Sequence, residues 1–454
     1  MKLISFKAKN IHDYMDFNIK FFDDLNFLAG LNGSGKTTVL SMIINLITPS
    51  FKNLIDINYE EIELKFSHQK NPNEKNKIYI IKTEKKNNDF YFSFNEKAIH
   101  INLVGIRIQD ENDIRYELQS DEVIRELEEI PTPMFLDLKR RFIDNSRSIN
   151  NRQNEIYRRS NKRIFYEDII LDEYNTDSSN DLSLHEVKNH IANLVNSITR
   201  KELKLSEKLK KDILRESLTI QELTTKDDLN IPTLEEINNY KRNILSTFEL
   251  LKLKDKDDKL FDDFFDSIEK IIKDLILIAE NRSNKLISEF DTKKENIIIS
   301  KWIINQPQLY RIIKLSKLIS NHQNSVKKLS EIKDKFLNAV NSFYNQTDKE
   351  LKISNTGEAE IIIKGKNRKI DYLSSGERQI LILFSHLYLN KNLPKSGVFI
   401  IDEPELSLHL LWQQSFVDAI IKAKPHLQII LATHSPAIIQ NKKNKYVPLN
   451  NVDE

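Results

Sequence analysis

The chain has 454 residues, with 69 Lys or Arg against 67 Asp or Glu, and its net charge of +2 gives no whole-chain argument for a nucleic-acid partner. Cysteine is absent, which excludes disulfides and thiolate metal sites and suits a reducing cytoplasm. Because the first residues lack a signal peptide's apolar core and no apolar run approaches the roughly 20 residues that span a bilayer, we expect a cytoplasmic protein without a membrane partner.

The first strong signal is a glycine-rich loop at residues 30–37, which reads Gly-Leu-Asn-Gly-Ser-Gly-Lys-Thr and fits G-x-x-x-x-G-K-[ST] at every fixed position. Residues 25–29 predict a buried strand before the loop, and residues 38–46 predict a helix after it. This order directs backbone N–H groups and the positive end of the helix dipole at a polyphosphate. The alternative, a glycine turn before an ordinary helix, leaves the lysine unexplained.

The residue types in this loop predict individual roles in an ATP site. Lys36 is expected to reach the β- and γ-phosphates as a catalytic residue, and the Thr37 hydroxyl is expected to ligate Mg2+. The other residues expected to contact ATP here are Asn32, Gly33, Ser34, Gly35 and Thr38.

From residue 1 to about residue 142 the pattern predicts mixed strands and helices. Ile62, Leu64 and Phe66 alternate with charged residues, which indicates a half-buried strand. Further strands are expected at residues 78–80 and 91–94, and residues 131–136 are expected to be a loop that enters one more buried strand.

The character of the chain changes after Arg140, because glycine is absent up to about Gln346 and charged residues are dense. We predict an insertion of several long helices over residues 143–330, with heptads too irregular for one long coiled coil. The insertion separates two halves of one α/β domain, residues 1–142 and 331–454. Three apolar faces at helical spacing support this prediction: Leu184, Val187, Ile191, Leu194, Val195 and Ile198; Phe261, Phe264, Phe265, Ile268, Ile271 and Ile272; and Leu315, Leu318, Ile319, Val326, Leu329, Ile332 and Phe336.

An apolar strand at residues 398–403 ends in two acids, as the Walker B strand of a P-loop protein does. Asp402 is expected to hold Mg2+, and Glu403 is expected to be the catalytic carboxylate that orients or deprotonates the attacking water. The alternative is a solvated loop, which is the commoner fate of an Asp-Glu pair. The strand before the pair, Pro404 after it and the loop at residues 30–37 favour catalysis.

Two further segments complete the set. Residues 372–379 form a small-residue loop that opens a helix, which is another anion site or a plain helix cap. A buried strand at residues 429–433 leads to His434, which can reach the edge of the γ-phosphate, although a lone His at a strand end is usually structural.

This set of motifs, in this order, resembles the ABC-type ATPase superfamily, with His434 as the switch histidine. The large helical insertion resembles the SMC, RecF and Rad50 branch rather than transporters. Residues 402–409, followed by Trp412 and Gln413, are similar to the OLD, Septu (PtuA) and PARIS (AriA) phage-defence ATPases. The signature loop is residues 373–377 and the D-loop is residues 406–409, so the resemblance adds Ser374, Ser375, Gly376, Glu377 and Ser407 to the ATP-binding residues.

The resemblance implies an α/β fold, an ABC-type P-loop ATPase head with a large all-helical insertion. It also implies that two chains bind head to tail around ATP and Mg2+. Ser374 and Gly376 of one chain would contact the γ-phosphate held by Lys36 of the other, and hydrolysis would loosen the dimer. The chain departs from transporters in carrying Ser375 where they have a second glycine. The Q-loop glutamine is not identifiable, with Gln109 and Gln153 as candidates.

OLD-type proteins carry a TOPRIM nuclease domain after the ATPase, whereas only 20 residues follow His434 here. His185 and His190 lack partners at metal-ligand spacing, so a solvated helix face is the preferred interpretation. We therefore expect ATP hydrolysis without nuclease activity. By the resemblance, a separate HNH-type or TOPRIM-type effector subunit does the cutting.

A basic stripe at residues 139–163 carries nine basic residues against Asp144 and Glu155, a net charge of +7, with Tyr157, Phe165 and Tyr166 close by. It could bind DNA or RNA, bind an acidic partner, or form a solvated helix face. The basic residues are Lys139, Arg140, Arg141, Arg147, Arg152, Arg158, Arg159, Lys162 and Arg163.

These observations favour an ATPase that serves as the sensor and scaffold subunit of a bacterial antiphage defence complex. The alternative is a RecF- or Rad50-like DNA-repair clamp, although the lack of cysteine excludes a zinc hook. A slow or inert ATPase that holds an oligomer and a transporter ATPase are two further hypotheses.

Overall fold

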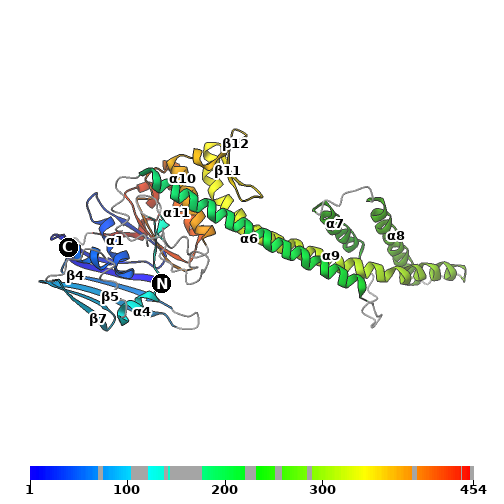
Figure 1. Ribbon diagram of the computed structural model, residues 1–454. Coiled ribbons are helices and arrows are strands. Elements are labelled where there is room, and N and C mark those ends of the chain that lie inside the picture. The colour runs from blue at the N-terminus through cyan, green and yellow to red at the C-terminus, as the bar shows by residue number, and fades with distance from the viewer. Residues whose placement is uncertain are drawn as a thin grey trace. The chain divides into compact units, whose positions relative to one another are not determined.

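The computed structural model describes residues 1–69, 75–103, 121–136, 142–143, 176–219, 232–250, 258–283, 289–390, 396–440 and 442–449. The chain forms two compact units (Figure 1). Unit 1 comprises Met1–Leu194 and Lys333–Glu454, and unit 2 comprises Val195–Ile332. Unit 1 is a mixed α/β domain and unit 2 is helical, which confirms the predicted fold class.

The central sheet of unit 1 has the strand order β15-β3-β14-β13-β8-β9. Its first five strands are parallel, and β9 pairs antiparallel to β8. Strands β3, β14 and β13 are continuous buried runs, as expected of parallel strands covered on both faces. The strands are β3 (Leu25–Ala29), β8 (Met134–Leu136), β9 (Phe142–Ile143), β13 (Gly397–Asp402), β14 (Leu427–Ala432) and β15 (Tyr446–Pro448).

Helices cover both faces of this sheet (Figure 1). Val398 and Ile400 of β13 share a core with Leu40 of α1 (Lys36–Ile47). The alternate residue Ile401 shares a second core with α10 (Ser375–Leu389) and α11 (Leu410–Ala423). Because successive side chains of a strand point to opposite faces, α1 and α10 lie on opposite sides of the sheet.

A second, antiparallel sheet has the order β2-β1-β4-β5-β6-β7. The predicted alternation in β4 is confirmed, since Ile62, Leu64 and Phe66 are fully buried. Buried Gln428 of β14 ties this sheet to the central one, because its side chain accepts a hydrogen bond from Leu3 N (2.6 Å) and donates to Leu3 O (2.8 Å). The elements are β1 (Lys2–Ile11), β2 (Met15–Lys20), α2 (Phe51–Asp56), β4 (Glu61–His68), β5 (Lys77–Lys86), β6 (Asp89–Phe94), β7 (Lys97–Asn102) and α4 (Glu122–Glu128).

A small three-stranded sheet precedes the signature loop and leads into it through a short 3-10 turn, η4 (Ile370–Tyr372). The other short elements of this half are η3 (Asn345–Thr347), β10 (Lys349–Ile353), β11 (Ala359–Ile363), β12 (Lys366–Lys369), α12 (Pro436–Ile439) and η5 (Lys443–Lys445).

The ends of two long helices, α6 (Thr176–Leu218) and α9 (Glu289–Tyr344), belong to unit 1. Leu184, Val187 and Ile191 share a core with Phe336 and Phe343. Unit 2 begins at residue 195, within the predicted insertion of residues 143–330.

Unit 2 consists of the remaining parts of α6 and α9 with α7 (Leu234–Leu250) and α8 (Asp258–Ser283). The predicted apolar face of α8 is confirmed, since Phe265, Ile268 and Ile272 are buried in the core of this unit. Helices α6 and α9 run side by side (Figure 1), joined by an ion pair between Lys314 and Glu216 at 3.2 Å. Within the described ranges, no helix has both the length and the apolar character needed to cross a membrane.

Three predictions fall on residues outside those that the structure describes: the nine basic residues of the stripe at 139–163, Gln109 and Gln153. The interpretation of two histidines as a solvated helix face holds only for exposed His185. His190 is half-buried and packs edge-on against the buried His386 ring, with centroids 5.0 Å apart. Burial, and then the His386 imidazole, lower the pKa of His190 to about 4.

Candidate nucleotide-binding site

Three loops that carry predicted ATP-site residues lie at one edge of the central sheet. The P-loop (residues 30–37) follows β3, His434 follows β14, and Glu403 follows β13. These strands are adjacent and parallel, and Asp402, Ala432 and Leu28 lie in register across them. Because the carboxyl ends of parallel strands meet at one edge, segments from both ends of the chain come together there.

The P-loop has the backbone geometry of an anion cradle. Gly33 and Gly35 adopt the left-handed region, with φ of 83° and 87°, where a side chain is strained. A Cβ at Gly35 would also come within 2.6 Å of the Phe17 ring. The hydroxyl oxygen of Ser34 is buried and has no hydrogen-bond partner within the described part of the chain. A phosphate oxygen can accept the hydrogen bond that such a hydroxyl donates.

Lys36 lies at the centre of the site and is only 5% exposed. Its ammonium donates to the carbonyl oxygens of Gly30 at 3.1 Å and Leu31 at 3.3 Å. It also forms a hydrogen bond with Nε2 of His434. Burial lowers the pKa of Lys36, although the carboxylates of Glu403, Asp402 and Glu405 act in the opposite direction.

Glu403 faces His434 across the site, with Oε1 3.3 Å from Nε2 of the imidazole. Burial, followed by the charges of Glu405 and Asp402, raises the pKa of Glu403 to about 7. Glu403 has a φ of 47°, a backbone conformation that is strained for residues other than glycine. Contacts with its surroundings must therefore hold this turn in place. A carboxyl group with a pKa near neutrality is suited to general-base work at physiological pH.

Thr37 and Asp402 form the part of the site suited to a divalent cation. The Thr37 hydroxyl donates to Asp402 Oδ2 at 3.0 Å, so two hard oxygen ligands lie side by side. Within the described residues no group of three or more His, Cys, Asp or Glu could hold a metal ion. Mg2+ at nucleotide sites uses one or two protein ligands, with water and phosphate for the rest, so this pair fits Mg2+.

Glu405 is a site residue that the sequence analysis did not single out. Its carboxylate accepts hydrogen bonds from the hydroxyl of Thr433 and from the backbone N–H groups of His434 and Ser435. The available signal was a third acid at the end of a buried strand, three residues after Asp402. Only the fold reveals its partners, because the β14 loop lies far away in the sequence.

The signature residues gather at the N-terminus of α10, next to the D-loop. Ser374 and Ser375 are exposed, and a Cβ at buried Gly376 would lie 2.3 Å from the carbonyl oxygen of Ser407. Glu377 instead faces inward, where its carboxylate binds Lys349 Nζ at 2.7 and 2.9 Å and accepts from Ser374 N at 2.8 Å.

The structure thus brings the P-loop, Asp402, Glu403 and His434 together within one chain. The signature residues belong to α10, on the opposite side of the central sheet from α1. The assigned contacts of these residues with ATP remain predictions.

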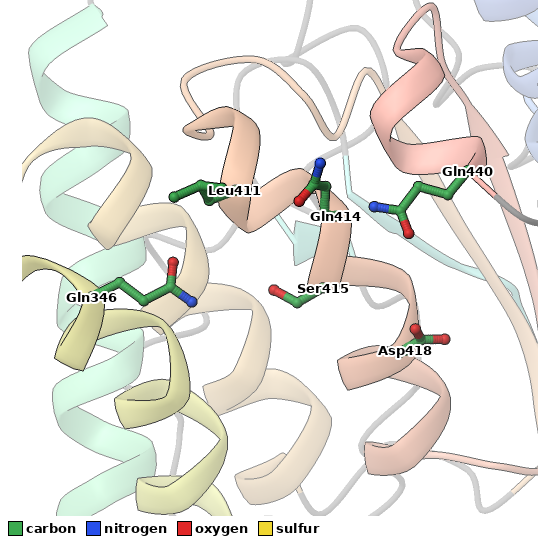
Figure 2. Close-up of a pocket in the computed structure, with 6 residues that line it drawn as sticks. All are labelled: Gln346, Leu411, Gln414, Ser415, Asp418 and Gln440. Atoms are coloured by element: carbon green, nitrogen blue, oxygen red, sulfur yellow. The ribbon is translucent and has the colours of Figure 1, made fainter.

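A separate hollow of about 510 Å³ lies along α11 (Figure 2), and none of its lining residues belongs to the P-loop. Asp418 in its lining forms an ion pair with Lys442 at 2.8 Å. The lining offers no cation to an anionic ligand, so it does not compete with the P-loop as a nucleotide site. It consists of Gln346, Leu411, Gln414, Ser415, Asp418 and Gln440.

A protein-family model described as "AAA domain, putative AbiEii toxin, Type IV TA system" matches residues 209–440, just over half of the chain. "Retron Vc95 probable ATPase" of Vibrio cholerae serotype O1 biovar El Tor is 26% identical over 209 residues, which cover 42% of this chain and 38% of that protein. "Retron Ec83 probable ATPase" of Escherichia coli is 31% identical over 149 residues, which cover 27% of this chain and 26% of that protein. The matched part spans less than two-fifths of either relative.

Two solved Smc head domains align with 97% of this chain at 12% identity. The head with a coiled coil and joint from Pyrococcus yayanosii is covered over 93% of its length, with a TM-score of 0.36. The head with an extended coiled coil bound to the C-terminal domain of ScpA, from Pyrococcus furiosus, is covered over 91%, with a TM-score of 0.39. With these TM-scores, the two alignments are too weak to support a conclusion about this chain.

The AAA family and the names of both relatives support ATPase activity, in agreement with the class of enzyme that the motifs predict. Since the family model covers more than half of its length, the chain belongs to the family "AAA domain, putative AbiEii toxin, Type IV TA system".

Proposed function

We propose that this chain hydrolyses ATP as the sensor and scaffold subunit of a bacterial antiphage defence complex. The observation that carries the enzymatic part is the contact of Lys36 with His434 and of His434 with Glu403, beside the Thr37–Asp402 pair. At one edge of the sheet, Lys36 can bind phosphate, the Thr37–Asp402 pair can bind a metal ion, and Glu403 can act as a base.

In the proposed reaction, the P-loop N–H groups and Lys36 bind the phosphates, and Ser34 gains a partner for its buried hydroxyl. Thr37 and Asp402 would hold Mg2+, which when bound neutralises charge on the phosphates. Glu403 orients the attacking water and accepts its proton, for which a pKa of about 7 is well placed. His434, between Lys36 and Glu403, contacts the edge of the γ-phosphate.

We further propose that two chains bind head to tail, with Ser374 and Gly376 of one chain on the γ-phosphate bound by the other. Two observations support this arrangement. Helices α1 and α10 lie on opposite sides of the central sheet, so the signature of one chain is not on the side of its own P-loop helix. Ser374 and Ser375 are exposed at a helix N-terminus, where they can meet a partner's phosphate.

The proposed role in defence is supported by the two relatives, each of which is named as a probable ATPase of a retron. We propose that the effector is a separate HNH-type or TOPRIM-type nuclease subunit. The product of the neighbouring gene is the first candidate for this effector.

A mixing experiment tests the enzyme and the dimer together. Lys36→Ala should abolish ATP binding, and Ser374→Arg should spoil hydrolysis while each monomer still binds ATP. An equimolar mixture should regain turnover well above that of either variant alone, because each mixed dimer has one intact composite site. A mixture as inactive as its components would contradict the head-to-tail arrangement.

The defence role is tested in cells that carry this gene with its neighbour. Wild-type cells should survive phage infection and Lys36→Ala cells should not, and the neighbouring product should co-elute with this chain. No protection and no co-eluting partner, together with ATP-dependent DNA binding by the lone chain, would favour a repair clamp instead.

A further inference from the structure

Glu405 joins the two loops that carry Glu403 and His434. It lies in the turn after β13, two residues beyond Glu403. Its carboxylate accepts four hydrogen bonds from the segment after β14. Thr433 Oγ1 lies 2.8 Å from each carboxylate oxygen, His434 N lies 2.5 Å from Oε1, and Ser435 N lies 3.0 Å from Oε1.

The backbone contact with His434 matters because it fixes the point from which the imidazole projects. The Nε2 atom of that imidazole contacts both Lys36 and Glu403. A shift of the His434 backbone would therefore change both distances together. Thr433 strengthens the link, since it is fully buried and its hydroxyl also accepts from Ser435 N at 3.0 Å.

The other end of the link is equally constrained. The turn that holds Glu403 is closed by hydrogen bonds from Leu406 N to Glu403 O at 3.1 Å and from Leu408 N to Glu405 O at 3.0 Å. Gln413 of α11 braces both loops, because its side chain donates to Leu408 O at 2.9 Å and accepts from the Ser435 hydroxyl at 2.6 Å. The strained φ of Glu403 needs such support.

We propose that Glu405 is a positioning residue for ATP hydrolysis, which holds His434 and Glu403 at a fixed separation by bonding the backbone of the β14 loop to the turn after β13. The inference rests on the proposed function. Glu405 does not need to touch ATP, because its effect passes through His434 and Glu403.

The test compares Glu405→Ala with Glu405→Gln, in which an amide oxygen can still accept from the backbone N–H groups. Glu405→Ala should lower kcat by about 10- to 100-fold, the effect of misplacing catalytic groups by about an ångström. The KM for ATP and the affinity for an ATP analogue should stay within about threefold of wild type, because the P-loop is untouched. Glu405→Gln should recover part of the lost kcat through these hydrogen bonds, although it removes the charge that helps to raise the pKa of Glu403.

Two controls separate positioning from general stability. Glu350→Ala removes an exposed carboxylate on β10 that pairs with Lys352 at 3.4 Å, and kcat should not change. Thr433→Val should lower kcat in the wild-type background but add little to Glu405→Ala, because residues that act through one link are non-additive.

The inference is overturned if Glu405→Ala keeps wild-type kcat, if its loss of kcat is matched by loss of ATP binding, or if Glu405→Gln is as impaired as Glu405→Ala. Wild-type protein without any ATP turnover would instead overturn the proposed function. The two failures are therefore distinguished by the wild-type measurement.

Discussion

The Thr37 hydroxyl of the P-loop donates a hydrogen bond to Asp402 at the end of β13, with 3.0 Å between the two oxygen atoms. Asp402 is 3% exposed, whereas Thr37 is exposed. The pair joins the N-terminus of α1 to the end of β13, and the whole helical region lies between these two elements in the sequence. It offers two adjacent hard oxygen ligands, the arrangement that Mg2+ uses beside a nucleotide.

Replacing Thr37 with Val should therefore raise the Mg2+ concentration needed for half-maximal ATP hydrolysis. The change keeps the shape of the side chain but removes the hydroxyl ligand, and we expect a shift of roughly tenfold or more. Titration of Mg2+ at saturating ATP measures it. Thr48→Val is the matched control, because the Thr48 hydroxyl only bonds the Ile44 carbonyl at the end of α1. Equal Mg2+ requirements in all three proteins would refute the assignment.

Glu403→Gln should stop hydrolysis while leaving ATP bound. Loss of a general base costs roughly 10²- to 10⁴-fold in turnover. Trapped ATP should then hold two chains together, so light scattering with ATP should give a dimer mass that wild type shows only transiently. Lys36→Ala provides the control, since it should stay monomeric with ATP. Unchanged turnover in Glu403→Gln would mean that another group is the base.

Gly376→Ala should damage the signature segment through contact with the D-loop. The new Cβ would lie 2.3 Å from the backbone oxygen of Ser407, so one of the two loops must move. We expect about 1–3 kcal/mol of destabilisation, as for other overpacked sites, and a loss of ATP turnover with nucleotide binding retained. Chemical denaturation and a binding assay measure the two effects.

Gly365→Ala gives a useful contrast to that variant. Gly365 also lies in unit 1 but has open space around its Cβ position and a φ of 76°. It should lose stability through backbone strain of about 1 kcal/mol and keep full turnover. If both variants kept wild-type turnover, the contact of Gly376 with the D-loop would have no role in the reaction.

Acidification should destabilise unit 1 through His190. Burial, with His386 adding to it and Glu186 opposing it, lowers the pKa of the folded His190 to about 4. As the pH falls from about 6.5, the unfolded chain binds a proton that the folded chain does not. Stability is therefore lost progressively between pH 6.5 and 4.

His190→Gln removes this titration. Between pH 7 and pH 5 the melting temperature of the variant should therefore fall by about 2–4 °C less than that of wild type. His185→Gln is the matched control, because His185 lies on the same helix but is exposed. It should keep the wild-type pH dependence. A His190→Gln slope equal to that of wild type would show that the imidazole does not titrate in this way.

Much of the site could be predicted from short segments of the sequence. The P-loop, the two acids after β13 and His434 each follow a run of buried apolar residues, and that local pattern predicts a strand end. The contacts that Glu405 and Gln413 make with the loop after β14 could not be predicted, because they depend on how β13 and β14 pair. Glu377 has a local role as a helix cap, but its ion pair with Lys349 depends on how β10 packs.

The sequence by itself determined which segments are strands and helices and which residue types could bind a phosphate, because these follow from local periodicity and from motifs of fixed spacing. Only the tertiary structure decided which of those segments pack together and which of their side chains come into contact. It aligned β3, β14 and β13 so that Lys36, Glu403 and His434 meet, and it put α1 and α10 on opposite faces of one sheet. The pKa of Glu403 near 7 has the same origin, since burial and neighbouring carboxylates exist only once the chain has folded.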